Sequence, residues 1–460
     1  MPKHYEKIGL PQRLYQTLCR LTGETAPHLV VAVSGGKDSM ALLYALSEEA
    51  RQKGCTLRAI HIDHGLRKQS RYEAMLVEKA CRAWKIPLIV EHLQVNANRM
   101  KGESIEMAAR RLRYQALEWQ REPEEWIVTA HHQNDVAETV LMHAIQGTGL
   151  RGLQGIPAKN GRIVRPMLAV SHEEIRCYID ACKIAHCEDQ SNADPAYLRN
   201  RIRNTLLPLL CRAYNPQVVR ALARLAEYAA EEEAYFAPIV ENLEKKAKIG
   251  EEKELGAWYD KDVLCAAPPP VLSRWAGQTL VKLGIRTEER MVRTLVRLTR
   301  ERGVCELAQG WRVKSGRFLE IFRSNVCRMA GQFAQGCTKI GPWRIEVIPA
   351  ERPEQYPSKQ ARIQYFDEDE IRWPCTARMR KPGDKIAMPY GQKSISDLFT
   401  DEKTPMALRD HFPIIECDGQ ILWAVGVARS RLAKITNQTK RMIAMRFTYT
   451  LEEEQPNERA

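Results

Sequence analysis

The sequence predicts an α/β protein whose first domain contains a parallel sheet, followed by a mainly helical middle domain and a small α+β domain. Three observations support this fold class. Short apolar runs alternate with segments of helical periodicity through the first third, charged helical patterns fill the middle, and short strands separated by turns follow from residue 341. A chain of 460 residues is also too long for one hydrophobic core, so two or three domains are expected.

The alternation in the first third defines the predicted sheet. Apolar runs rich in β-branched residues are predicted strands, and the periodic segments between them are predicted helices. The strands are expected at 28–33, 57–63, 86–90 and 126–130, and the helices at 40–50, 70–84, 103–120 and 135–145. This βαβα order implies parallel strands covered by helices on both faces, with ligands bound outside the carboxyl ends of the strands.

Composition marks the boundaries of the later domains. Residues 199–217 carry four arginines and no acidic residue, which indicates the exit from the first domain. The triple proline at 268–270 predicts a break between helices, and 306–323 has the pattern of a hairpin with its turn at Lys314, Ser315 and Gly316. We predict domains at 1–212, 213–335 and 336–450, and a disordered tail at 451–460.

The net charge and the cysteines limit which partners and which cellular compartment we expect. The net charge of +13 favours a polyanionic partner such as nucleic acid. We expect no membrane partner and a cytoplasmic location, because the chain has neither an apolar run of about eighteen residues nor a signal peptide. The 13 cysteines are scattered without a CxxC pair and are expected to be reduced thiols. Cys177, Cys182 and Cys187 recur beside His186 at a spacing unusual for zinc, so metal binding there stays open.

The hexapeptide Ser34-Gly35-Gly36-Lys37-Asp38-Ser39 follows the first predicted strand and opens a predicted helix. Two glycines allow a tight turn and a close approach of the backbone to a ligand. The free N–H groups and the positive end of the helix dipole favour phosphate, to which the serine hydroxyls and Lys37 add donors. An acidic residue inside an anion site fits a magnesium ligand, so Asp38 is predicted to bind Mg²⁺ on the phosphates.

Two further polar clusters follow the second and fourth strands. The second strand ends at Asp63 and is followed by His64 and Arg67, and the fourth is followed by His131, His132 and Asp135, with Glu138 one helical turn later. The carboxyl ends of parallel strands meet at one edge of a sheet, so the three clusters are expected to converge. One such cluster could be an ordinary turn, but three in register favour a functional site.

The hexapeptide lacks the GxxxxGK[ST] pattern of a Walker A loop. It resembles instead the PP-motif of the ATP pyrophosphatase superfamily, which implies an adenine-nucleotide α-hydrolase-like fold for the first domain. Members of that superfamily cleave ATP between the α and β phosphates. They transfer AMP to a carbonyl oxygen or a carboxylate, and pyrophosphate leaves.

Further motifs narrow the resemblance. HIDHGLR, AARRLRY, TAHHQNDVAET, DQSN and RNRIR follow one another in this order, and RMRKPGDKI, SISDLF and ILWAVGVARS follow near the C-terminus. Together they resemble the tRNA(Ile)-lysidine synthetase family over most of the chain, most weakly at 218–371. The resemblance implies a ligase that uses ATP and Mg²⁺, with tRNA(Ile) bearing a CAU anticodon and free L-lysine as partners. Such an enzyme adenylates the carbon-2 oxygen of the wobble cytidine, and the ε-amine of lysine then displaces AMP to form lysidine.

Roles follow from this chemistry. ATP is expected to contact Ser34, Gly35, Gly36, Lys37, Asp38, Ser39, His61 and Asp63. Asp135 and Glu138, three apart on one helix face, are expected to hold the ammonium group of lysine, and either could take the proton of its ε-amine. The predicted catalytic residues are Asp38, Lys37, Asp135, Glu138 and Arg113. The predicted tRNA contacts are His64, Arg67, Arg110, His131, His132, Arg201, Arg203, Arg378, Arg380 and Lys381.

Three alternatives share part of these observations. A tRNA thiolase of the same superfamily would share the loop and the basic charge but normally needs paired cysteines. A small-molecule synthetase would share the ATP chemistry but leave the basic C-terminal region without a partner. A non-catalytic RNA-binding protein would explain the charge but not three polar clusters at strand ends. The oligomeric state is also open, with a homodimer through the helical middle region as one arrangement.

Overall fold

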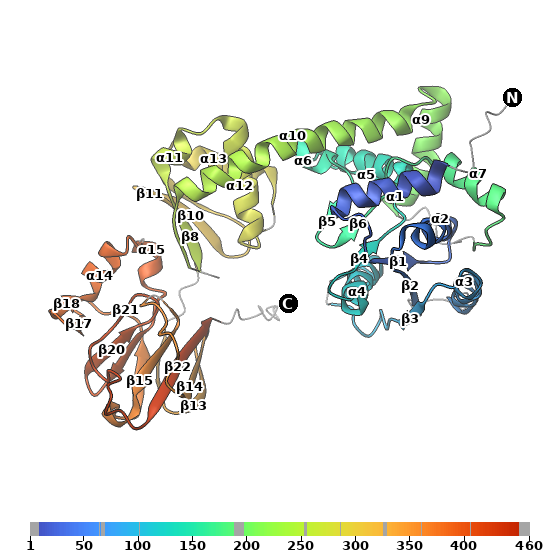
Figure 1. Ribbon diagram of the computed structural model, residues 1–460. Helices are drawn as coiled ribbons and strands as arrows, with labels where there is room; N and C mark the ends of the chain where they lie inside the picture. Colours follow the sequence, from blue (N-terminus) through green and yellow to red (C-terminus); the bar gives the residue numbers. More distant parts are fainter. Residues whose placement is uncertain are drawn as a thin grey trace, which may run out of the picture. The chain divides into compact units, whose positions relative to one another are not determined.

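The computed structural model describes residues 9–63, 65, 70–100, 102–187, 197–252, 255–285, 287–324, 329–359, 361–404 and 406–449 (Figure 1). The chain divides into two compact units, Met1–Tyr235 and Phe236–Ala460, called the N-terminal and C-terminal units below. The boundary falls within α10 (Val218–Ala247), a helix of 30 residues. The three predicted domains stay a prediction, and the predicted disordered tail lies outside the described residues.

The N-terminal unit contains a six-stranded sheet in the order β3-β2-β1-β4-β6-β5. Its strands are β1 (Leu29–Val33), β2 (Leu57–Asp63), β3 (Leu88–His92), β4 (Trp126–Val128), β5 (Lys159–Asn160) and β6 (Ile163–Val164). The four predicted strands are present and parallel, and β6 extends the parallel part while β5 runs antiparallel at the edge. The sequence did not predict β5 and β6, because strands of two residues carry no periodic signal.

Helices cover both faces of this sheet, as predicted. The helices α1 (Gly9–Thr22), α2 (Lys37–Lys53), α3 (Ser70–Trp84) and α7 (His172–Cys182) pack against one face, which Val31 and Val33 of β1 line. Helix α4 (Ile105–Gln120) covers the opposite face, where Val30 packs with Leu117. Successive side chains of a strand point to opposite faces, so one apolar run supplies both cores.

A helical layer beside the sheet carries the carboxylates of the third polar cluster. Helix α5 (Gln133–Ile145) packs against α6 (Leu150–Leu153), α8 (Leu198–Arg201), α9 (Leu207–Ala213) and the first part of α10. Between α8 and α9 the chain forms a π-helical turn at Ile202–Leu206. Such turns are rare and occur frequently at functional sites.

The C-terminal unit begins with an antiparallel sheet packed against helices α11 (Lys261–Cys265), α12 (Pro269–Lys282) and α13 (Glu289–Leu298). The sheet has the order β7-β8-β11-β10-β9, formed by β7 (Lys248–Glu252), β8 (Gly256–Asp260), β9 (Gly303–Glu306), β10 (Trp311–Ser315) and β11 (Phe318–Arg323). The predicted hairpin is β10–β11, and the triple proline lies at the start of α12 after the end of α11, as predicted. The predicted turn position is wrong for Lys314 and Ser315, which pair with Glu320 and Leu319, so the turn begins at Gly316. Strands β7 and β8 were not predicted within this mainly helical stretch. Strand β7 has charged residues in place of an apolar alternation, and its Gly250 lies against the Trp258 ring of β8.

The last part of the chain has the predicted α+β character. One sheet contains β12 (Ala330–Phe333), β16 (Cys375–Arg378), β19 (Ile414–Cys417), β20 (Gln420–Ala424), β17 (Lys385–Met388), β18 (Gly391–Ser394) and β21 (Ala428–Arg429). The other contains β13 (Gly336–Ile340), β14 (Trp343–Pro349), β22 (Met442–Tyr449) and β15 (Ile363–Asp367). The two sheets share one core with the short helices α14 (Ile395–Asp401) and α15 (Met406–Arg409) around it. Across the described residues, no helix combines the length and apolar character that a membrane span requires.

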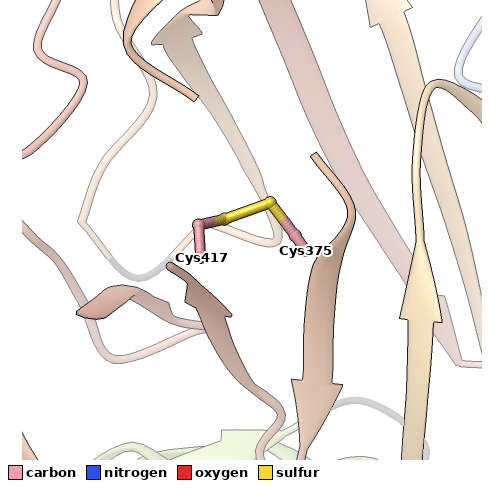
Figure 2. The surroundings of a disulfide bond; sticks show 2 residues. All are labelled: Cys375 and Cys417. Carbon is pink, nitrogen blue, oxygen red and sulfur yellow. A yellow bond between two sulfur atoms is a disulfide. The ribbon is translucent and has the colours of Figure 1, made fainter. Parts of the chain in front are cut away.

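A disulfide joins Cys375 of β16 to Cys417 of β19 (Figure 2). The prediction that all cysteines are reduced thiols is therefore wrong for this pair, whereas ten other described cysteines are outside any disulfide. The two strands are antiparallel neighbours, which brings the Cα atoms within 4.6 Å although 42 residues separate them in the chain. Sequence spacing alone does not show which strands will be neighbours, so the pairing could not be predicted.

Candidate active site

The loop between β1 and α2 leaves a helix N-terminus open for an anion. Helix α2 begins at Lys37 and its N-cap is Gly36, where no side-chain cap hydrogen bond forms within the described part of the chain. Gly35 has a φ of +85°, in the left-handed region that glycine adopts without strain. The free amides and the positive end of the dipole therefore face the space beyond the sheet edge, as the phosphate prediction requires.

The two serines of the loop stabilise its conformation. Ser39 Oγ donates to the carbonyl of Gly36 at 2.9 Å and lies 3.1 Å from Ser34 Oγ, which accepts a hydrogen bond from the Gly36 amide at 3.3 Å. The backbone amide of Cys187 adds a bond of 2.9 Å to the Gly35 carbonyl, so a distant segment is fastened to the loop. Sequence reasoning missed this contact with Cys187, which depends on tertiary structure alone.

Asp38 lies in the first turn of α2 with one oxygen available to a cation. Its buried Oδ1 has no hydrogen-bond partner among the residues that the structure describes, and its Oδ2 is 3.6 Å from Nε2 of His132. A buried carboxylate oxygen without a donor beside an open helix N-terminus fits a ligand of Mg²⁺ on bound phosphates. Magnesium usually takes only one or two carboxylates and completes its shell with phosphate and water oxygens.

A metal site at Cys177, Cys182 and Cys187 was left open by the sequence. In the described parts of the chain, no group of three or more His, Cys, Asp or Glu side chains, these three cysteines included, is placed so that it could hold a metal ion.

His132 links Asp38 to helix α5 and is buried, with an exposed fraction of 5%. Its Nδ1 accepts a hydrogen bond from the Asn134 amide at 3.2 Å, and its own amide donates to Asp135 Oδ2 at 2.9 Å, which together cap α5. This arrangement places the Nε2 proton towards Asp38 and Asp135, each 3.6 Å away. Although burial opposes a charge, the contact with Asp38 and the charge of Asp135 raise the pKa of His132.

The raised pKa of His132 predicts a pH-dependent stability. A His132→Asn variant keeps a capping side chain but removes the charge. The stabilisation by protonated His132 is fully present below its unfolded pKa of about 6.5, and it disappears as the pH rises through the higher folded pKa. The difference in melting temperature between wild type and variant should therefore shrink as the pH rises above about 6.5 and through the higher folded pKa of His132. Thermal unfolding with a chelator and without nucleotide measures this difference, and a constant difference across this range would contradict the assignment.

The other histidines and Asp63 occupy distinct environments. Burial and the charges of nearby arginines lower the pKa of His131 to about 3, although Asp135 opposes them, so His131 is neutral. Buried His61 has Nδ1 at 2.8 Å from the Val33 carbonyl, and burial lowers its pKa. Asp63 accepts a hydrogen bond from the Gly65 amide at 2.8 Å and contacts Nδ1 of His92 at 3.2 Å. His64 and Arg67 lie outside the described residues, as does the motif Asp189–Asn192.

Asp135 and Glu138 form a compact ion cluster with two arginines that follow in the chain. Arg199 bonds Asp135 Oδ1 at 2.9 Å and Glu138 Oε2 at 3.0 Å, and Arg203 bonds Glu138 Oε1 at 2.6 Å and Asp135 Oδ1 at 2.9 Å. Both carboxylates are buried, and only 1% of Glu138 is exposed. Although burial opposes the charge, His132 and Arg199 lower the pKa of Asp135.

The partner of Arg203 in this cluster differs from the predicted one. The guanidinium was expected to contact tRNA, but in the structure it faces the two carboxylates. Arg199 was not predicted as a site residue. The residue spacing could have identified Arg199. Arg199 and Arg203 are four residues apart and so lie on one helical face, and Asp135 and Glu138, three residues apart, likewise lie on one face of another helix. Arg201, between the two arginines, is exposed.

Arginines of α4 line the same sheet edge. Exposed Arg110 and half-buried Arg113 lie 5.2 Å and 5.4 Å from the centre of the Tyr114 ring. Burial lowers the pKa of Arg113, and the charges of Arg110 and Arg199 act in the same direction. Arg110, Arg113 and Arg199 therefore place several positive charges near one another at this sheet edge.

The predicted RNA contacts of the C-terminal unit differ in accessibility. Arg378 is buried, and its guanidinium bonds Asp384 at 2.9 Å and Glu416 at 2.7 Å, which directs its charge inward. Arg380 donates to Asp410 at 2.7 Å, whereas Lys381 is exposed. The sequence showed the charges of this segment but not their acidic partners.

Known proteins match the chain along most of its length. Residues 10–210 match the family described as PP-loop domain, and residues 375–445 match the one described as TilS substrate C-terminal domain. A tRNA(Ile)-lysidine synthase of Parabacteroides distasonis is 32% identical, over 95% of this chain and 98% of its own length. The proteins of the same name from Caldanaerobacter subterraneus and Bacillus subtilis are 27% and 29% identical, over 97% and 87% of this chain and 100% and 90% of their own lengths.

Proposed function

The chain belongs to the tRNA(Ile)-lysidine synthase family of ATP-dependent ligases, and on that basis we propose how its N-terminal unit joins lysine to tRNA(Ile). The observation that carries the proposal is the open N-terminus of α2 beside Asp38, with a buried carboxylate–arginine cluster at the same sheet edge. The first feature suits the phosphates of ATP, and the second suits a substrate that carries both signs of charge.

The first step is adenylation of the base. The carbon-2 oxygen of the wobble cytidine attacks the α-phosphorus of ATP, the bond to the β-phosphate oxygen breaks, and pyrophosphate leaves. The amides at the start of α2 and the charge of Lys37 stabilise the negative charge that pyrophosphate acquires. Asp38 is the proposed ligand of Mg²⁺, which when bound neutralises phosphate charge. His132 is the nearest described partner of Asp38, with its Nε2 at 3.6 Å from Oδ2, and is proposed to orient that carboxylate by its charge.

The second step is displacement of AMP. The ε-amine of lysine attacks carbon 2, the bond from that carbon to the AMP oxygen breaks, and the amine loses a proton. Asp135 and Glu138 are the proposed holders of an ammonium group, with Arg199 and Arg203 fixing their positions. The lowered pKa of Asp135 favours this electrostatic role over proton abstraction, because a carboxylate of low pKa is a weak base.

The tRNA is proposed to contact exposed cations of each unit separately. Arg110 and Arg201 are exposed and suit phosphate contacts, as does Lys381 in the C-terminal unit. Arg203 and Arg378 take positioning roles in this proposal, because their guanidinium groups face carboxylates. The proposed roles of His64 and Arg67 in RNA binding rest on their motif alone.

A homodimer and a cytoplasmic location are also part of the proposal. Exposed Leu225, Tyr228, Tyr235 and Ile239 recur at intervals of three, seven and four residues along α10, which forms an apolar stripe suited to a second copy of the same helix. The proposed substrates, ATP and tRNA, are cytoplasmic molecules.

The test is transfer of radiolabelled lysine to an unmodified tRNA(Ile) transcript with a CAU anticodon, with ATP and Mg²⁺. We expect label that survives mild alkali, which removes aminoacyl esters but not a base adduct, together with equal amounts of AMP and pyrophosphate. A transcript with uridine at the wobble position is the matched control and should take up no label. AMP formation without lysine incorporation would indicate another acceptor chemistry, such as thiolation, and the absence of both would refute the catalytic proposal.

A further inference from the structure

Arg165 and Tyr114 form a second polar cluster, on the face of the sheet opposite α2. Arg165 directly follows β6, in which Ile163 packs with Tyr114 on the α4 side while Val164 packs on the α2 side. Alternation along the strand places Arg165 on the α4 side, next to Tyr114. The cluster is therefore distinct from the loop that is proposed to bind the ATP phosphates.

Both side chains have a buried polar atom without a partner. Only 5% of Arg165 is exposed, its Nη1 donates to the Pro157 carbonyl at 2.8 Å, and its Nε has no acceptor within the described residues. The buried hydroxyl of Tyr114 has no hydrogen-bond partner there either. Buried donors are nearly always satisfied in folded proteins, and an unsatisfied donor on a charged group is especially costly. The Tyr114 oxygen lies close enough to the Arg165 guanidinium for this contact to lower the tyrosine pKa, but the two groups form no hydrogen bond of normal length, which indicates a missing acceptor.

The charges around this cluster indicate that the acceptor is an anion. Although burial opposes it, the charges of Arg110, Arg113 and Arg165 lower the pKa of Tyr114. His131 is neutral, because burial and the arginines lower its pKa to about 3. Asp135 is the carboxylate whose charge acts to raise the pKa of His131, and it is already bonded to Arg199 and Arg203. The positive charge around Arg165 and Tyr114 is therefore not balanced by that carboxylate.

We propose that Arg165 Nε and the Tyr114 hydroxyl bind an anionic oxygen group of a substrate other than ATP. Within the proposed function, on which this inference rests, two groups have that chemistry: the α-carboxylate of the amino acid and a phosphate of the tRNA strand. Arg165 suits both, because a guanidinium donates to carboxylate and phosphate alike. Its fixed position at the end of β6 makes it a residue for substrate selection.

The test compares lysine with lysinamide, in which the carboxylate is replaced by a neutral amide. Wild type, Arg165→Gln, Tyr114→Phe and Arg162→Gln are assayed for kcat and KM with lysine, lysinamide and tRNA. Arg162 is the matched control, because it lies at the other end of β6 with its guanidinium 4.6 Å from the centre of the Trp126 ring system. Tyr114→Phe removes only a hydroxyl without a described partner, so it tests the site even if Arg165→Gln destabilises the fold.

If the group is the carboxylate, KM for lysine rises by about tenfold to a hundredfold in the two site variants, KM for lysinamide stays the same, and Arg162→Gln behaves as wild type. If the group is a phosphate, KM for tRNA rises instead and the preference for lysine over lysinamide is kept. Unchanged constants in both folded site variants would overturn the inference. Failure of the wild type to form lysidine would refute the proposed function separately, before any variant is compared.

Discussion

Replacing Asp38 with asparagine is expected to lower the rate of AMP formation on the order of a thousandfold, which is the scale at which loss of one transition-state contact acts. The variant keeps the shape of the side chain but removes the negative charge that would hold Mg²⁺ beside the start of α2. The measurement is pyrophosphate release with saturating tRNA across a Mg²⁺ titration. Excess Mg²⁺ should recover little of the loss, because the ligand itself has changed.

Stability should be nearly unchanged in Asp38→Asn at a pH above the folded pKa of His132, where the contact between the two side chains no longer involves a protonated imidazole. The closest described partner of Asp38 is His132 at 3.6 Å, which is too long for a strong hydrogen bond. The matched control is Asp180→Asn, which removes an identical charge from an exposed position on α7 of the same unit and should leave activity intact. Retention of more than about a tenth of the wild-type rate by Asp38→Asn would exclude the metal-ligand role.

Replacing Glu138 with glutamine is expected to destabilise the N-terminal unit by about 3 kcal/mol, the lower end of the cost of breaking a buried ion pair. Glu138 is almost fully buried and accepts hydrogen bonds from Arg199 and Arg203, whose side chains are one third exposed. That exposure lets water screen the arginines, which keeps the cost at the lower end. Pulse proteolysis in urea, with fragments of the N-terminal unit quantified by mass spectrometry, measures the change.

Two comparisons separate structure from substrate binding at Glu138. Glu78→Gln breaks an exposed pair with Arg82 on α3 and should change stability by no more than about 0.5 kcal/mol. In the folded fraction of Glu138→Gln, KM for lysine should rise by about tenfold if the carboxylate helps to hold an ammonium group. Lost stability with an unchanged KM would assign Glu138 to the architecture of the site alone, and unchanged stability would contradict the cluster itself.

Local patterns in the sequence predicted the sheet and the phosphate-binding loop. Strands β1 to β4 and helix α3 could be found because apolar periodicity and glycine chemistry act within a few residues. The partners of charged side chains could not be found in this way. Asp135 and Glu138 were predicted as free carboxylates for a ligand, yet they bond Arg199 and Arg203, which lie 61 to 68 residues further along the chain.

The contacts of several histidines, cysteines and arginines could not be predicted from the sequence either. His132 was predicted to contact tRNA, but it caps α5 and faces Asp38, because helix geometry turns its Nδ1 to the backbone. Cys187 carried no signal of its contact with the loop, since its amide and not its thiol makes the bond. Arg165 was not identified because nothing in its sequence neighbourhood shows that its Nε is buried without an acceptor.

The ion cluster of Asp135, Glu138, Arg199 and Arg203 affects the order in which parts of the protein can fold during synthesis. Asp135 and Glu138 leave the ribosome well before Arg199 and Arg203, and until both arginines follow, α5 would have to bury two uncompensated negative charges. The sheet edge therefore cannot close around a nascent chain that ends before residue 203. Domains generally fold as units during translation, and this requirement ties completion of the catalytic unit to emergence of the basic segment that ends it. A shortened product of stalled translation would then leave α5 undocked and recognisable as unfolded, instead of yielding a partly built ATP site.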